Sequence, residues 1–317
     1  MRFRVFIGIA IGSILFGSSV FAQRSVKKPR RAAPPSFQPN EFSGIFFTDA
    51  LSQLQGEMPN AQSVLTANAK PDNAIGGAIG GESVSNATGN AVWKELISPT
   101  TIEDIIKESK TRLDAVVTTP AKFSGAVGDA RREFTLLATT MAVVSQYPEE
   151  IRWQSSAAYA QRMFARMADN SKVGTPAVFN EAKLRQQDLQ NMLKGSKLTG
   201  TADEVSWEGT ADRGPTMQLL EWALRKNLIV STNNEKSFRE SQEDVVKYAE
   251  LIAMLGNVIQ KPGMKDADAD EYKQFSMAMT QAASDATKAS KANDPELART
   301  AVSRIEQACN RCHETYR

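Results

Sequence analysis

The sequence predicts an all-α protein in which an antiparallel four-helix bundle at the C-terminus follows a second helical region. Two observations lead to this fold class. From about residue 101 onward, apolar side chains recur at i, i+3, i+4 and i+7, the spacing of an amphipathic helix. Proline and glycine separate these stretches by short connections, which favour antiparallel helix neighbours. With 317 residues, of which 41% are hydrophobic, the chain can bury a sizeable core.

Residues 1–22 have the pattern of a secretory signal peptide. Arg2 and Arg4 precede an apolar stretch at residues 5–16, and Val20-Phe21-Ala22 matches a small-x-small cleavage site. We therefore expect a periplasmic or otherwise exported protein. If the segment stays uncleaved, the alternative is an N-terminal membrane anchor, with the rest of the chain facing the periplasm.

Residues 23–100 are expected to form a basic, Pro-rich arm followed by a Gly/Asn-rich linker. The chain has 38 basic and 36 acidic residues, and seven of the basic ones lie in residues 1–31, which hold no acidic residue. The arm therefore suits either a solvated linker or association with a membrane or another cell-envelope surface. Because the rest of the chain is mildly acidic, we expect no nucleic-acid binding. Residues 61–91 hold too few large apolar side chains to form a core.

Residues 101–200 are expected to form a helical region without a cofactor. Thr101 is predicted as the N-cap of its first helix, and further helices are predicted at about 121–147, 151–169 and 176–194. The region contains no cysteine and no histidine, so it shows no evident chemistry of its own.

Residues 205–317 are expected to form the four-helix bundle. Its helices are predicted at about 215–230, 236–260 and 269–291, and from Asp294-Pro295 to the C-terminus. The acidic run at residues 266–270 is similar to a calcium-binding loop but lacks the glycine and the final glutamate that such a loop needs. We interpret this run as the solvated start of the third helix.

The last helix ends in Cys309-Asn310-Arg311-Cys312-His313, and the spacing C-x-x-C-H is typical of covalent attachment of a c-type haem. Each thiol can form a thioether with one haem vinyl group, and His313 can bind the iron as proximal axial ligand. The chain has two cysteines and one histidine in total, which excludes a four-ligand zinc site, a bis-histidine haem and a second haem of this type. The sixth iron position is therefore a methionine, a rarer ligand, or empty.

Residues 211–317 resemble the class II cytochromes c, the group of cytochrome c′ and cytochrome c-556. The resemblance rests first on the C-terminal motif, in which Cys309 and Cys312 match the thioether sites and His313 the proximal ligand. Arg317, four residues later, matches a basic residue that the family commonly places beside the proximal imidazole. The resemblance implies a four-helix bundle that carries one covalent haem c near the C-terminus of its last helix.

The resemblance also points to two residues on the first helix of the bundle. Arg213 matches an arginine near the haem propionates, and Met217, one helical turn later, matches the side chain over the distal face. In members of the c-556 type this methionine is the sixth iron ligand, whereas high-spin c′ members carry a non-coordinating side chain there. Rival candidates for the sixth ligand are Met254, Met277 and Met279.

We expect an exported cytochrome with one covalent haem that acts in one-electron transfer with a redox partner protein. One alternative is a five-coordinate haem protein that binds small gases such as NO or CO. Another is an envelope interaction protein in which the haem is auxiliary. We expect no enzymatic activity, because the haem region offers no distal histidine and no nucleophile–base pair is recognised elsewhere. The sequence leaves a homodimer open.

Overall fold

A computed structural model of the chain describes residues 86–200 and 206–316. These residues form helices, and no strand occurs among them, which confirms the all-α fold class. They belong to one compact unit that spans Gly80–Arg317. Within this part of the chain, no helix is both long enough and apolar enough to cross a membrane. The predicted signal peptide, the basic arm and Arg317 lie outside the described residues.

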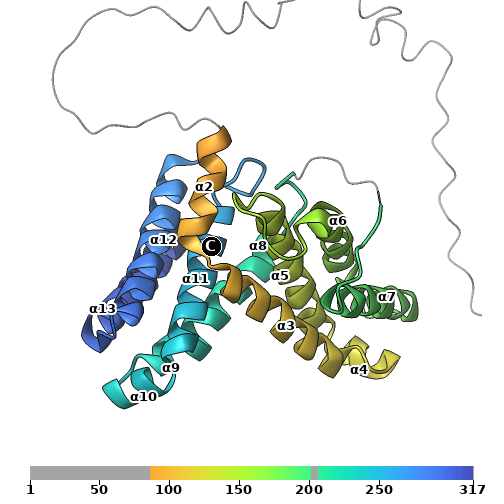
Figure 1. The fold of residues 1–317 in the computed structure, drawn as a ribbon, viewed down its shortest axis with the longest axis horizontal. Coiled ribbons are helices and arrows are strands. Elements are labelled where there is room, and N and C mark those ends of the chain that lie inside the picture. Colours follow the sequence, from red (N-terminus) through yellow and green to blue (C-terminus); the bar gives the residue numbers. More distant parts are fainter. Residues whose placement is uncertain (1–85, 201–205, 317) are drawn as a thin grey trace, which may run out of the picture. The chain divides into compact units, whose positions relative to one another are not determined.

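Five helices form what we call the N-terminal helix group, coloured brown to green in Figure 1. They are α3 (Pro99–Val116), α4 (Pro120–Gly125), α5 (Val127–Ser145), α6 (Gln154–Asn170) and α7 (Pro176–Leu193). Three of them, α3, α4 and α7, begin with the same capping motif. The side chains of Ser98, Thr119 and Thr175 each accept a hydrogen bond from the backbone N–H three residues later, and each of these cap residues is followed directly by a proline. This combination of N-cap and first-turn proline defines where a helix starts.

The helices that follow α7 along the chain form the C-terminal helix group, coloured teal to blue in Figure 1. They are α8 (Arg213–Glu221), the π-helical segment η2 (Trp222–Leu228), α9 (Ile229–Ser231), α10 (Glu235–Glu240), α11 (Gln242–Val258), α12 (Asp270–Lys291) and α13 (Pro295–Thr315). Asn234 and Asp294 cap α10 and α13 through their side chains. The segments α8, η2 and α9 follow one another without a break, so they act as one long first helix.

In the N-terminal group, α5 packs along α6 and against α3, while α7 contacts both α6 and α3. Large aromatic side chains fill the space between these helices. Phe134 of α5 and Phe164 of α6 are fully buried and stack with 6.3 Å between ring centroids. Phe123 of α4 meets Phe179 of α7 at 5.8 Å. Aromatic burial of this kind supplies much of the stabilisation of a small core.

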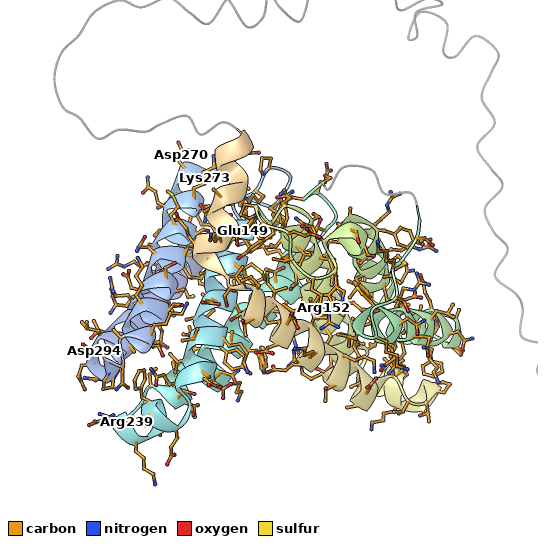
Figure 2. The ribbon with its side chains drawn as sticks, in the orientation of Figure 1. Glu149, Arg152, Arg239, Asp270, Lys273 and Asp294 are labelled. Carbon is orange, nitrogen blue, oxygen red and sulfur yellow. The ribbon has the colours of Figure 1, made fainter. Side chains whose placement is uncertain are left out.

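In the C-terminal group, α12 packs against both α11 and α13, and η2 contacts α11 and α13. Asp270 and Asp294, the residues at the start of α12 and α13, lie at opposite ends of this helix pair (Figure 2). The buried positions of α12 are mostly small side chains, which lets neighbouring helices approach closely; the alanines among them are Ala282, Ala283, Ala286 and Ala289.

The start of the helical region differs from the prediction. The arm and linker were expected to extend to residue 100, but this segment contains α2 (Asn86–Leu96) and the first residues of α3. Trp93 of α2 is fully buried and meets Trp207 at 5.8 Å between ring centroids. Tertiary burial of Trp93 therefore outweighs the poor helix-forming composition around it. The predicted cap at Thr101 is also wrong, because Ser98 caps α3 and Thr101 is buried in its first turn.

Two helices that were expected to be continuous are broken. The predicted helices at 121–147 and 236–260 each divide into a six-residue helix and a long one, at Ala126 and at Ser241. The interpretation of residues 266–270 as a helix start is wrong except for Asp270. Asp266 has a left-handed backbone with φ 64°, and α12 begins only at Asp270.

Candidate functional site

The C-terminal motif lines a cavity of about 800 Å³ in the C-terminal helix group. Cys309, Cys312 and His313 reach it from the last turns of α13. The two cysteines lie three residues apart, and such a pair shares one face of a helix. The structure therefore brings together all three residues of the predicted attachment motif.

Both cysteines are free thiols, partly buried at the cavity. Burial raises the pKa of the Cys309 thiol to about 11, and the neighbouring Cys312 adds to this effect. Burial also raises the pKa of Cys312, while Arg213 acts in the opposite direction. Burial therefore disfavours the thiolate form at both sulfurs.

Two of the methionine candidates line the cavity. Met217 reaches it from α8 and Met279 from α12, and the thiol of Cys309 lies 3.7 Å from the sulfur of Met279. Met254 is instead fully buried in α11 and does not line the cavity, and Met277 is 52% exposed. The structure thus narrows the candidates for a methionine ligand to Met217 and Met279.

Arg213 lies where the first helix of the group meets the C-terminus. Its guanidinium donates to the carboxylate of Asp266 and to the backbone carbonyl of Tyr316, and it stacks over the ring of Tyr272 at 5.5 Å. Tyr316 in turn meets Tyr272 edge to face, with 5.3 Å between ring centroids. Arg213 therefore holds the end of α13 against α8 and α12, although it is not among the side chains lining the cavity.

The remaining lining of the cavity divides into an apolar part and a polar rim. Leu220, Leu224 and Phe275 supply large apolar side chains. Arg225 lines it as well and pairs with Glu306 at 3.3 Å and with Glu221 at 3.5 Å. An apolar interior with a few polar groups at its edge is typical of a cofactor site, and the volume lies in the usual range of ~300–1,000 Å³.

Sequence reasoning missed the π-helical segment η2, which provides Leu224 and Arg225 to the cavity. The turn is wider than an α-helical one, and the side-chain amide of Asn227 donates to the carbonyl of Trp222 at 3.0 Å. π-Helical turns occur frequently at functional sites. Apolar periodicity does not reveal a single π turn, because the pattern on either side of it remains helical.

The residues around the cavity fit a c-type haem. Two thiols and an imidazole line one apolar cavity, and thioether sulfur is available from methionines on α8 and α12. This donor set can bind a porphyrin covalently and supply iron with soft or borderline ligands.

Residues 267–317 match the family model of cytochrome c′. The match confirms the expected resemblance of the C-terminal region to class II cytochromes c, a family that implies a covalently bound c-type haem with iron. It covers α12 and α13, and therefore Cys309, Cys312 and His313. No curated protein and no solved structure matches the chain.

Proposed function

We propose that the C-terminal helix group is an antiparallel four-helix bundle that carries one covalent haem c and acts in one-electron transfer. The observation that supports this most is that Cys309, Cys312 and His313 line the same apolar cavity at the end of α13. Haem iron, when bound, accepts and returns one electron. The redox partner is a second protein, and no catalytic step on a substrate is proposed.

The chain's own residues hold the attachment helix in place. Arg213 binds the carbonyl of Tyr316 just after α13, and Tyr272 supports both residues from α12. Burial raises the pKa of Tyr272 to about 12, so this ring stays a neutral packing element at all physiological pH values. Leu220 and Phe275 line the cavity with apolar side chains, and the burial of a haem is one of the means by which a protein sets its potential.

We assign the sixth-ligand role to Met217 rather than Met279. The sulfur of Met279 lies 3.7 Å from that of Cys309, the residue that would hold one vinyl group of the haem. Met279 is therefore suited to pack against the haem beside that vinyl group. Met217 comes from α8 instead, a different helix from the one that holds His313, and it lines the same cavity. A His/Met pair raises the haem potential relative to bis-histidine ligation.

A second function, binding of small gases, is favoured by one observation. Beside the two methionines, Leu220, Leu224 and Phe275 line the cavity. If neither methionine coordinates the iron, these apolar side chains close a distal face that admits a small neutral molecule. Optical spectra of the ferric and ferrous protein with and without CO distinguish the two functions, because only the gas-binding form is high-spin and takes up CO rapidly.

Covalent attachment is tested by acid–acetone extraction. We expect the haem colour to stay with the unmutated protein. In Cys309→Ser or Cys312→Ser at most one thioether remains, and we expect haem incorporation to fall at least ~10-fold because maturation is impaired. Clean extraction of haem from the unmutated protein would contradict the attachment.

Ligation by Met217 is tested with a matched pair of variants. Met217→Leu is expected to abolish the weak sulfur-to-iron band at the red end of the ferric spectrum and to turn the iron high-spin. Met279→Leu, the same substitution in the same cavity, is expected to keep that band. The assignment to Met217 is wrong if Met279→Leu loses the band and Met217→Leu keeps it.

We further propose that the protein is exported, with processing after Ala22 and the basic arm close to the cell envelope. The support is the basic and then apolar N-terminus, together with a haem motif whose attachment normally takes place outside the cytoplasm. N-terminal sequencing of protein from the native envelope tests this, since a chain that still begins at Met1 indicates the anchored form.

A further inference from the structure

The two helix groups repeat one order of elements. Each begins with a long helix, continues with a six-residue helix, and then has three long helices. In the N-terminal group these are α3, α4, α5, α6 and α7. In the C-terminal group they are α8 to α9 taken as one helix, α10, α11, α12 and α13.

The six-residue helices match in detail. Thr119 caps α4 and Asn234 caps α10, each through its side chain. Four residues after each cap stands a phenylalanine, Phe123 or Phe238, and both are fully buried. Each short helix therefore has a polar N-cap and, four residues later, a buried phenylalanine. The two helices pack on their cores through the same position.

The breaks after these helices match as well. Ala126 ends α4 with φ −125° and ψ 22°, and Ser241 ends α10 with φ −126° and ψ 24°. Directly after each break begins the long central helix of the group, α5 or α11. The two breaks have nearly the same backbone angles, and both lie between the six-residue helix and the long helix that follows it. This agreement indicates that the two groups are built alike.

The last helices begin alike too. Thr175-Pro176 opens α7 and Asp294-Pro295 opens α13, in each case with a side-chain cap and a proline at the first helical position. Counted from these caps, Cys309, Cys312 and His313 of the C-terminal group correspond to positions 190, 193 and 194. These positions are Gln190, Leu193 and Lys194, none of which can attach a haem or bind its iron as the motif does.

The π-helical segment agrees with this correspondence. The caps of the first two helices, Ser98 and Thr119, are 21 positions apart in the N-terminal group, whereas Asp212 and Asn234 are 22 apart in the C-terminal group. One inserted residue in a helix is accommodated as a π turn, and η2 lies between the second pair of caps.

The groups dock reciprocally. At the N-cap of α3, the backbone N–H and hydroxyl of Ser98 donate to Glu250 of α11 at 3.0 and 2.8 Å. At the N-cap of α8, Asp212 accepts from Arg131 of α5. In both cases the first helix of one group meets the central helix of the other. The reciprocity holds for the helices, while the two partner residues differ by about one helical turn, since Glu250 corresponds to Thr135 and not to Arg131. An approximate twofold axis between two copies produces such a pairing of helices.

The two groups also meet through ionic and aromatic contacts. Lys247 of α11 donates to Glu108 of α3 at 2.6 Å, and the Lys247 side chain is 15% exposed. Arg112 of α3 stacks over Trp222 of η2 at 5.0 Å, and Trp222 meets Tyr248 edge to face at 5.2 Å. The docking face therefore consists of α3 and α5 on one side and of α8, η2 and α11 on the other.

We propose that residues 98–194 are a second copy of the unit formed by residues 212–315, without haem-attaching residues, and that this copy serves as a built-in partner subunit. Because it occupies the face where a second copy would dock, the full chain is a monomer. This proposal does not depend on haem binding by the C-terminal group.

The first test is the mass of the mature full-length chain by sedimentation over a wide range of concentrations. We expect one chain per particle. If the full-length chain instead sediments as a dimer within this range of concentrations, the proposal of a built-in partner is wrong.

The second test is a double-mutant cycle across the docking face. Glu108→Lys and Lys247→Glu are each expected to lower the melting temperature by about 5 °C. The double variant is expected to recover only part of this loss, because Arg112 beside position 108 and Asp244 beside position 247 then face a like charge. The matched control is Glu235→Arg with Arg239→Glu, an exposed pair within α10, for which we expect shifts below ~1 °C.

If the charge reversals give no soluble protein, the milder cycle Ser98→Ala with Glu250→Gln probes the same face. Coupling in either cycle supports the docking. A monomer in which both cycles are additive overturns it, because the two groups are then not held together through this face.

Discussion

The two helix groups share an order of helices but differ in how their interiors are filled near the end of the last helix. In the N-terminal group, Leu189 near the end of α7 is fully buried. At the corresponding place in α13 stands Ala308, which lines the cavity of about 800 Å³. At this place the small side chain of Ala308 lines the cavity, whereas the large side chain of Leu189 fills the interior of its own group.

A second difference concerns the first helix. In the N-terminal group α3 is a regular helix, while in the C-terminal group the π segment η2 interrupts it. The wider turn allows Leu224 and Arg225 to face the cavity while Trp222 faces the docking surface. The first helix of the C-terminal group thereby contributes side chains both to the cavity and to the docking face.

The largest effect is expected from making the C-terminal group resemble the N-terminal one. Ala308→Leu places a large side chain in the cavity next to Cys309, where it occupies volume that a bound haem would need. We expect haem content per chain, measured by absorbance of exported protein, to fall about 10-fold. Helix content by circular dichroism should stay unchanged.

The control is Ala298→Leu, the same substitution at a buried position near the other end of α13. It is expected to cost about 1–3 kcal/mol of stability without a selective loss of haem. Equal haem loss in both variants would show that the effect comes from general destabilisation. The exchange of Leu189 for Ala308 would then not explain why only the C-terminal group has this cavity.

The second effect compares the two buried phenylalanines. Phe123→Ala and Phe238→Ala each remove a fully buried ring at the same place in their group. We expect each to lower the free energy of unfolding by about 3–5 kcal/mol in urea denaturation. Leu297→Ala, at a position that is 59% exposed, is the control and should stay within about 0.5 kcal/mol. If one substitution lowers the free energy of unfolding strongly and the other hardly changes it, the two phenylalanines do not have corresponding roles in their groups.

The smallest effect is a pH dependence at the docking face. Burial acts to raise the pKa of Glu250, but hydrogen bonds from Lys291, Thr101 and Ser98 outweigh it and lower the pKa below its ordinary value of 4.5. Folding therefore favours the ionised carboxylate, and this stability is present above pH 4.5 and is lost as the pH falls through the folded-state pKa. Glu250→Gln should cost about 2 kcal/mol at pH 7 and progressively less in acid.

The pKa of Glu133 in the N-terminal group is shifted in the opposite direction. Burial raises its pKa above 4.5, although Arg112 and Ser109 act in the other direction. Its protonated form is therefore favoured by folding, and its contribution to stability is lost as the pH rises through the folded-state pKa. The stability difference between the unmutated protein and Glu133→Gln should change with pH in the direction opposite to that for Glu250→Gln. The same direction for both would contradict the two assigned pKa shifts.

Much of the helical content could be predicted from the sequence, because helix signals are local. The predicted helices at 151–169, 176–194 and 269–291 lie within a few residues of α6, α7 and α12. The pair Asp294-Pro295 begins the last helix as expected. The C-x-x-C-H motif is local as well, since its chemistry depends on residues that share one or two helical turns.

Only the tertiary structure decided which distant residues meet. The burial of Trp93 against Trp207 determines α2, and no local periodicity indicates it. The approach of Met279 to Cys309 depends on how α12 packs on α13, which sequence spacing does not specify. The docking of Ser98 on Glu250 joins residues 152 positions apart. Local signals indicate most of the long helices, whereas the exact helix ends and the choice of packing faces depend also on the burial of side chains from the whole unit.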